Sequence, residues 1–185
     1  MIKIAQIGCG YWGPNLLRNF SGLSNCELSN VVEVSQARQQ YLSNNFPKID
    51  NSKSYNQILA DSSIVAVVIA TPANLHFEQA KQALLSNKHV FVEKPMATKV
   101  EEVKILTELA SARKLTLMSG HTFLYNNAVR FVKEQIDKGE LGDIRYIYSQ
   151  RLNLGRIRSD VDALWNFAPP DVSIVQYWLG GQKPL

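Results

Sequence analysis

The segment Ile2-Lys3-Ile4-Ala5-Gln6-Ile7-Gly8-Cys9-Gly10-Tyr11-Trp12-Gly13 decides the fold of this chain. Its first half is typical of a buried strand, and its second half fits the pattern G-x-G-x-x-G where a helix opens. In that pattern the first glycine allows a sharp turn, the second a close approach to a diphosphate, and the third close helix–strand contact. The free N–H groups of the helix favour an anion. The segment therefore predicts a βαβ unit that binds a dinucleotide.

Short β-branched runs and longer segments of helical period continue to alternate up to residue 120, as in parallel strands joined by crossover helices. The predicted fold class is α/β, a doubly wound parallel sheet of Rossmann type over residues 1–120. Thr98 and Glu101 are expected to form a capping box, and residues 43–57 to form a surface connection with room for one short edge strand. The expected strands are Ile2–Ile7, Glu27–Val34, Ile64–Ala70, His89–Val92 and Leu115–Met118, and the expected helices are Trp12–Phe20, Gln36–Asn44, Ala73–Ser86 and Lys99–Lys114.

A different pattern follows Gly120. A helix is expected around Ala128–Asp137, then a long strand over Asp143–Leu154, then a helix over Val172–Leu179. A single strand cannot satisfy its backbone groups or bury an aromatic face. Residues 121–185 are therefore expected to form the start of an incomplete α+β domain, either as a fragment or in a chain that borrows strands from a partner.

Composition excludes several classes of protein. Of the 185 residues 45% are hydrophobic and 19% charged, which predicts a globular chain. A net charge of +4 without a block of basic residues argues against a nucleic-acid partner. The longest apolar run, Ile64–Ala70, is too short to span a membrane as a helix. Cys9 and Cys26 are too few for a disulfide framework, and Met1–Ile4 does not resemble a signal peptide, so a cytoplasmic location is expected.

Glu33 stands 20 residues after Gly13, at the end of the second expected strand. A carboxylate there accepts hydrogen bonds from ribose hydroxyls and repels a 2′-phosphate, which favours NAD over NADP. The alternative interpretation is a solvated glutamate at a strand end. Arg38, in the next helix, leaves NADP as the weaker possibility.

Two further motifs lie at carboxyl ends of strands, where doubly wound sheets bind ligands. They are Ala70-Thr71-Pro72-Ala73-Asn74-Leu75-His76 and Glu93-Lys94-Pro95. Together with the glycine turn they resemble the amino-terminal part of the Gfo/Idh/MocA family of nicotinamide-dependent sugar oxidoreductases. The stretches 120–125, 151–158 and 165–169 narrow the resemblance to the branch that oxidises UDP-N-acetyl-hexosamines or their uronates at C3.

The resemblance implies a role for individual residues. Lys94 is the implied catalytic lysine, preceded by Glu93 at the cofactor, and the peptide before Pro95 is expected to be cis. His121 is a second catalytic candidate, weighed equally against a structural role. The implied cofactor-binding residues are Gly8, Gly10, Tyr11, Trp12, Gly13, Glu33, Arg38, Thr71, Pro72, Asn74, His76, Glu93 and Lys94, and the implied substrate-binding residues are Arg151, Asn153, Arg156, Arg158 and Asn166.

Partners follow from the same resemblance. The implied substrate is a nucleotide sugar, and a homo-oligomer is implied if the second domain is complete. Arg151, Arg156 and Arg158 suit a diphosphate or a carboxylate, although a solvated basic edge is the equal alternative. Asp160 and Asp162 lack neighbouring histidines or cysteines, so no metal site is predicted.

One departure from the family pattern concerns catalysis. Asn166 matches the acidic or amide position of the pattern, but Pro170 stands four residues later where a histidine belongs. Loss of such an acid/base group costs about 10²–10⁴-fold in rate. The alternative function is therefore an NAD-binding module with impaired catalysis.

Overall fold

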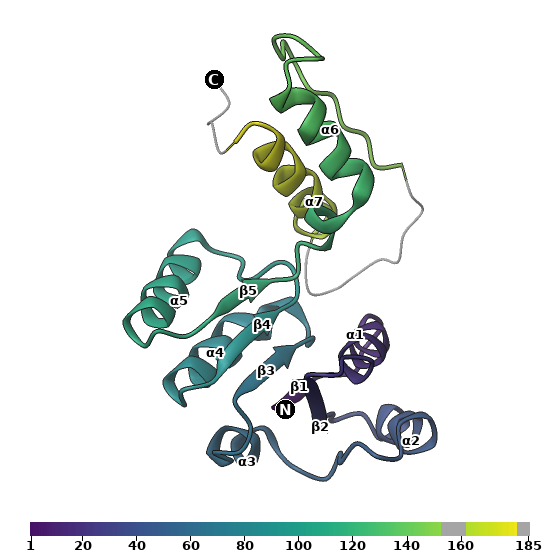
Figure 1. The fold of residues 1–185 in the computed structure, drawn as a ribbon. Coiled ribbons are helices and arrows are strands. Elements are labelled where there is room, and N and C mark those ends of the chain that lie inside the picture. Colours follow the sequence, from purple (N-terminus) through teal and green to yellow (C-terminus); the bar gives the residue numbers. More distant parts are fainter. Residues whose placement is uncertain (153–161, 181–185) are drawn as a thin grey trace. The chain divides into compact units, whose positions relative to one another are not determined.

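The computed structural model describes residues 1–152 and 162–180. The chain divides into two compact units, Met1–Gly120 and His121–Leu185, whose elements are labelled in Figure 1.

The first unit is built on one parallel sheet of five strands, in the order β2-β1-β3-β4-β5. Val- and Ile-rich runs form these strands because a parallel sheet is buried on both faces. This arrangement confirms the predicted Rossmann-type α/β fold. The strands are β1 (Ile2–Ile7), β2 (Cys26–Val32), β3 (Ala66–Ile69), β4 (His89–Val92) and β5 (Leu117–Ser119).

Helices cover both faces of this sheet (Figure 1). Alternate residues of β1 enter different cores: Ile4 packs with Leu16 and Leu17 on one face, and Ala5 and Ile7 pack on the other. The face of Ile4 is covered by α1 (Gly13–Ser21) and α2 (Gln36–Asn45), and the face of Ile7 by α3 (Tyr55–Ala60), α4 (Ala73–Leu85) and α5 (Val100–Ala112).

One helix, α3, and the capping box at its start were not predicted from the sequence. Helix α3 begins inside the predicted surface connection, and Ser54 and Gln57 form a capping box at its start. The expected box at Thr98 and Glu101 is wrong, because α5 begins later, with Lys99 as its N-cap and no side-chain cap bond. The edge strand expected in this connection is a single parallel bridge between Asn30 and Asp50.

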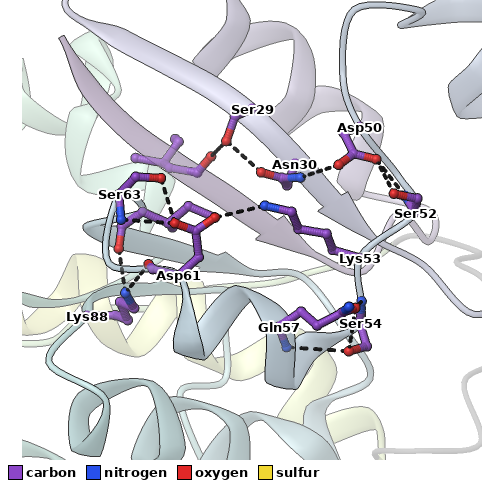
Figure 2. Close-up of polar contacts among 12 residues, drawn as sticks. Ser29, Asn30, Asp50, Ser52, Lys53, Ser54, Gln57, Asp61, Ser63 and Lys88 are labelled. Carbon is purple, nitrogen blue, oxygen red and sulfur yellow. Dashed lines mark hydrogen bonds and ion pairs between the residues drawn. The ribbon is translucent and has the colours of Figure 1, made fainter.

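A polar network joins the connection between α3 and β3 to the start of β4 (Figure 2). Lys88 is 4% exposed, and its Nζ donates to the Asp61 carbonyl oxygen at 2.6 Å and the Ile64 carbonyl oxygen at 2.7 Å. Burial lowers the pKa of Lys88. Lys53 pairs with the Asp61 carboxylate at 2.8 Å. Because Lys88 satisfies two backbone carbonyls, the network has a structural role.

Within its described residues, the second unit contains a 3₁₀ turn and two helices. They are η1 (Thr122–Tyr125), α6 (Asn127–Asp137) and α7 (Ala163–Trp178). The helix expected over Val172–Leu179 begins nine residues earlier (172 − 163), with Asp162 as its N-cap: the Trp165 N–H donates to the Asp162 carboxylate at 2.9 Å.

The strand predicted over Asp143–Leu154 is wrong for its described part. Residues 143–152 form neither a strand nor a helix, and Tyr146, Tyr148 and Leu152 are exposed. A strand needs a neighbour to satisfy its backbone groups, and none pairs with this segment among residues 1–152 and 162–180. Residues 153 and 154 lie outside the described part of the chain.

Candidate cofactor and active site

The carboxyl ends of the parallel strands bring the motif residues of the first unit to one edge of the sheet. The Gly8 N–H donates to the Val32 carbonyl oxygen at 2.8 Å, the Ala70 N–H to that of Ile7 at 2.8 Å, and the Glu93 N–H to that of Ile69 at 2.9 Å. The glycine turn, Glu33 and the segments beginning at Thr71 and Glu93 therefore follow neighbouring strands. This is the edge at which open α/β sheets bind ligands.

Each glycine of the turn has a different steric environment. Gly8 has φ +90°, and a Cβ there would lie 2.8 Å from the Ala70 carbonyl oxygen, so only glycine fits. A Cβ on Gly13 would lie 3.1 Å from Gln6 Nε2 and 3.2 Å from the Gly8 oxygen. A Cβ on Gly10 would meet no atom within 4 Å. The turn therefore packs tightly at its two ends and is open at its centre.

The start of α1 has no side chain that neutralises its dipole. Trp12 is its N-cap and makes no side-chain cap bond, and the first turn contains no acidic residue. Tyr11 and Trp12 are both exposed beside the turn. Backbone N–H groups of such a first turn bind anions, and an open centre at Gly10 suits a diphosphate.

Glu33 ties the end of β2 to the glycine turn. Its carboxylate accepts the Cys9 N–H at 2.7 Å and the Val34 and Ser35 N–H groups at 2.8 Å each. The positive charge of Arg38 slightly lowers the pKa of the Cys9 thiol. Burial raises the pKa of the Cys9 thiol to about 11, so this cysteine stays protonated at neutral pH.

His76 connects the loops that follow β3 and β4. Its ring is 1% exposed, with Nδ1 2.7 Å from the Pro95 carbonyl oxygen and Nε2 2.9 Å from that of Thr71. The Thr71 hydroxyl donates to Gln79 Oε1 at 2.6 Å. Pro72 and Asn74 are exposed at the start of α4. The geometry thus gives His76 two backbone contacts at its two ring nitrogens, and places Asn74 at the surface.

Glu93 is a buried carboxyl directly before Lys94. It is 9% exposed, and its Oε2 accepts the Lys94 N–H at 3.2 Å. Burial raises the pKa of Glu93, an effect partly offset by the Lys94 N–H and charge and by the Trp12 indole. A Cβ on Gly120 would lie 3.0 Å from this carboxyl, so the glycine makes room for it. As expected, the Lys94–Pro95 peptide is cis.

The second unit contains a cavity of about 630 Å³. Apolar side chains of α7 form most of its wall, and its polar lining includes His121, Gln176 and Tyr177. Burial lowers the pKa of His121, and its Nδ1 is buried without a hydrogen-bond partner in the described part of the chain. Trp165 also lines the cavity, whereas the Trp178 indole donates to the Val129 carbonyl oxygen at 2.9 Å.

The predicted substrate-binding residues are only partly described. Arg151 donates from Nε to the Asp171 carboxylate at 2.6 Å, and its guanidinium lies 5.0 Å from the Phe123 ring centre. Asn166 lies on α7, one helical turn before Pro170. Asn153, Arg156 and Arg158 lie outside the described residues.

Residues 1–152 and 162–180 hold no group of three or more His, Cys, Asp or Glu side chains placed to bind a metal ion. No helix in the same ranges has the length and apolar character needed to cross a membrane.

Two residues at the sheet edge were not predicted. Gln6 donates to the carbonyl oxygens of Gly8 and Gly13, at 2.8 and 3.2 Å. The available signal was a polar residue inside an apolar strand. Gly120 accommodates the Glu93 carboxyl, and no sequence pattern marks that role.

A parallel sheet with a glycine turn and an open helix start defines a dinucleotide-binding protein of the Rossmann class. The model of the oxidoreductase family with an NAD-binding Rossmann fold, GFO_IDH_MocA, matches residues 2–121. The chain belongs to this family, which confirms the family resemblance inferred from the motifs.

Relatives of the chain have several activities. It is 33% identical over 146 residues to glucose-6-phosphate 3-dehydrogenase of Bacillus subtilis (strain 168), which covers 78% of this chain and 40% of the relative. It is 27% identical over 151 residues to 2,7-anhydro-N-acetylneuraminate hydratase of Escherichia coli (strain K12), covering 82% and 40%.

A solved structure is also similar. A variant of a 3-ketoreductase from Actinomadura kijaniata, in complex with TDP-benzene and NADP, superposes with a TM-score of 0.71 at 28% identity, covering 78% of this chain and 44% of that one. The chain thus spans less than half the length of these relatives.

Proposed function

We propose that this chain is the cofactor-binding part of a dehydrogenase that oxidises a sugar hydroxyl with NAD. The observation that carries the proposal is the glycine turn, open at Gly10, on the same sheet edge as Glu93-Lys94-Pro95. Glu33 would bind the adenosine ribose, and Arg38 leaves NADP as the second choice. When bound, the nicotinamide supplies the hydride acceptor.

Lys94 is the proposed catalytic base. It follows β4 and precedes Pro95, whose carbonyl oxygen contacts His76. A lysine amine beside the reacting hydroxyl accepts its proton as the hydride leaves the carbon, or lowers the pKa of that hydroxyl while charged. The two ring nitrogens of His76 contact the carbonyl oxygens of Pro95 and Thr71. We therefore assign it the positioning of the Thr71 and Pro95 loops.

The proposed substrate is a UDP-activated amino sugar or its uronate. Three features support a nucleotide-linked sugar: the motifs at residues 120–125, 151–158 and 165–169, the cavity of the second unit, and the nucleotide ligand in the structure of the 3-ketoreductase. Asn166 and Arg151 are the proposed substrate contacts within the described residues.

The proposal also covers the location and the assembly of the protein. Cys9 and Cys26 are both free thiols. We place the protein in the cytoplasm because a reducing compartment keeps thiols in this state. A homo-oligomer would form through the sheet of a complete second domain.

The second candidate function is dinucleotide binding without turnover. Pro170 favours it, since this residue lies inside α7 where the family pattern has a histidine. A proline side chain can neither accept nor donate a proton. If the protein is active, Lys94 or His121 must carry out all proton transfer.

Calorimetric titration of NAD and NADP, followed by assays of nicotinamide reduction with UDP-sugars, tests the proposal. We expect saturable binding with preference for NAD, and growth of the reduced nicotinamide absorbance with a UDP-amino sugar. Binding without turnover by any UDP-sugar would favour the second candidate. Absence of binding to either dinucleotide would contradict both.

The variant Lys94→Ala tests the assignment of the base. We expect its turnover to fall by about 10²–10⁴-fold because the proton acceptor is lost. NAD titration of the same variant shows whether the cofactor site is intact. Turnover equal to that of the wild type would exclude Lys94 as the base.

A further inference from the structure

Gln6 is a buried amide directly beneath the glycine turn. It lies in β1, is 0% exposed, and belongs to a strand whose other residues from Ile4 to Ile7 are apolar. Its Nε2 donates to the Gly8 carbonyl oxygen at 2.8 Å and to the Gly13 carbonyl oxygen at 3.2 Å. One side chain therefore binds both ends of the turn, and both of its N–H groups are used.

The contact at Gly8 fixes a whole peptide plane. In a trans peptide the carbonyl and the following N–H point in opposite directions within one rigid plane. The oxygen of the Gly8–Cys9 peptide accepts from Gln6, and its N–H donates to Glu33 Oε2 at 2.7 Å. Gln6 and Glu33 thus hold this peptide from opposite sides.

The contact at Gly13 fixes the other end of the turn. Gly13 is the first residue of α1, and a Cβ there would lie 3.1 Å from Gln6 Nε2 and 3.2 Å from the Gly8 oxygen. The amide, the first glycine and the helix start therefore pack against one another. The open centre at Gly10 lies between these two fixed ends.

The stability of the folded chain does not explain why an amide stands at position 6. Gln6 Oε1 is buried and has no hydrogen-bond partner among residues 1–152 and 162–180. A buried acceptor without a partner is unfavourable, so part of what the two donated bonds contribute is lost again. An apolar residue would suit the core around Ile4, Leu16 and Leu17.

We propose that Gln6 is a positioning residue that holds the glycine turn in the shape that binds the diphosphate of the dinucleotide. The inference rests on the proposed cofactor-binding function. Without the two donated bonds the Gly8–Cys9 peptide can rotate away from Glu33, and the first turn of α1 can shift relative to β1. Cofactor affinity then decreases although the sheet remains folded.

The experiment compares Gln6→Leu and Gln6→Glu with the wild type. Leucine removes both donors, and glutamate keeps the size but places oxygens against two carbonyl oxygens. Isothermal titration with NAD gives the dissociation constant, and urea unfolding gives the stability of each variant. We expect Gln6→Leu to bind NAD about tenfold more weakly, which corresponds to about 1.4 kcal/mol, and Gln6→Glu to bind it more weakly still.

Asn30→Leu is the matched control. Asn30 is a buried amide of the same sheet, 3% exposed, and its side-chain bonds go to Ser29 and Asp50 rather than to the turn. We expect this variant to lose stability and keep the NAD affinity of the wild type. Gln6→Met provides an unbranched apolar replacement if leucine prevents folding.

The outcomes separate this inference from the proposed function. If the wild type binds neither NAD nor NADP, the proposed function fails and this inference fails with it. If the wild type binds NAD and the Gln6 variants bind it equally well, this inference alone is overturned. It is also overturned if Asn30→Leu weakens binding as much as Gln6→Leu, because the effect would then follow from stability.

Discussion

At the scale of single residues, the sheet edge holds two carboxyl groups, Glu33 and Glu93, next to tightly packed glycines. Glu33 accepts three backbone N–H groups, whereas Glu93 is buried with one oxygen, Oε1, that has no hydrogen-bond partner in the described residues. The two carboxyls therefore differ in environment. Glu33 is held as a hydrogen-bond acceptor, and burial favours the protonated form of Glu93.

The raised pKa of Glu93 predicts a pH dependence of stability. Above pH 4.5, the ordinary pKa of this group, the unfolded chain loses the proton while the folded protein still holds it. The folded state then binds more protons, so the free energy of unfolding decreases as pH rises toward the folded pKa and levels off above it. Glu93→Gln removes this contribution.

Urea unfolding of the wild type and Glu93→Gln across this pH range measures the effect. We expect the stability of the variant relative to the wild type to increase with pH and then become constant. A relative stability that does not change with pH would show that the carboxyl ionises alike in both states.

Motif residues could be proposed as site residues from the sequence because each has a local signal. The glycine spacing and the position of Glu33 predicted a turn and a carboxylate that lie in contact in the structure. Gln6 and Gly120 could not be assigned, because their partners are set by tertiary packing. The interpretation of His76 as a cofactor ligand stays a prediction, and its observed contacts are with backbone oxygens.

At the scale of elements, the Lys88 side chain joins the connection between α3 and β3 to the start of β4. Lys88 Nζ donates to the carbonyl oxygens of Asp61 and Ile64, just before β4 begins (Figure 2). These contacts join two crossover connections at the amino ends of β3 and β4. They lie at the opposite edge of the sheet from Lys94.

Lys88→Met tests this connection. The variant leaves two carbonyl oxygens without their donor, and we expect it to lower the free energy of unfolding by about 1–3 kcal/mol. Lys53→Met is the control, because Lys53 forms a more exposed pair with Asp61 and should change stability less. Equal losses in both variants, measured by urea unfolding, would contradict the role given to Lys88.

The strands that have a clear pattern of apolar residues and that pair with neighbouring strands were well predicted. Strands β1 and β4 have the predicted bounds, and the other three strands differ by one or two residues at each end. The strand expected after residue 142 was wrong. The alternation of apolar and polar residues is only a local signal, whereas a strand also needs a neighbouring strand with which to pair. Helix α3 was missed because its six residues are too few for a clear apolar period.

At the scale of the whole molecule, the two hydrophobic cores of the sheet lie entirely within residues 1–120. The glycine turn, Glu33, His76 and Lys94 are in the same unit. The residues proposed for cofactor binding and proton transfer therefore belong to one folding unit, and the proposed substrate contacts belong to the other.

A chain shortened to Met1–Gly120 tests this division. We expect it to unfold in one cooperative transition, as small domains with their own core do, and to bind NAD as tightly as the 185-residue chain. It should show no oxidation of UDP-sugars. Circular dichroism measures the unfolding transition, and calorimetric titration measures NAD binding. Loss of either folding or NAD binding would contradict the assignment of the cofactor site to this unit.

The variant Gly10→Ala tests the central claim, that the glycine turn binds the diphosphate. The added methyl group would meet no protein atom within 4 Å, so stability should stay within about 0.5 kcal/mol of the wild type. It would occupy the space that the diphosphate needs, so calorimetric titration should show NAD binding at least about tenfold weaker. Unchanged NAD affinity in a fully folded Gly10→Ala variant would contradict the account.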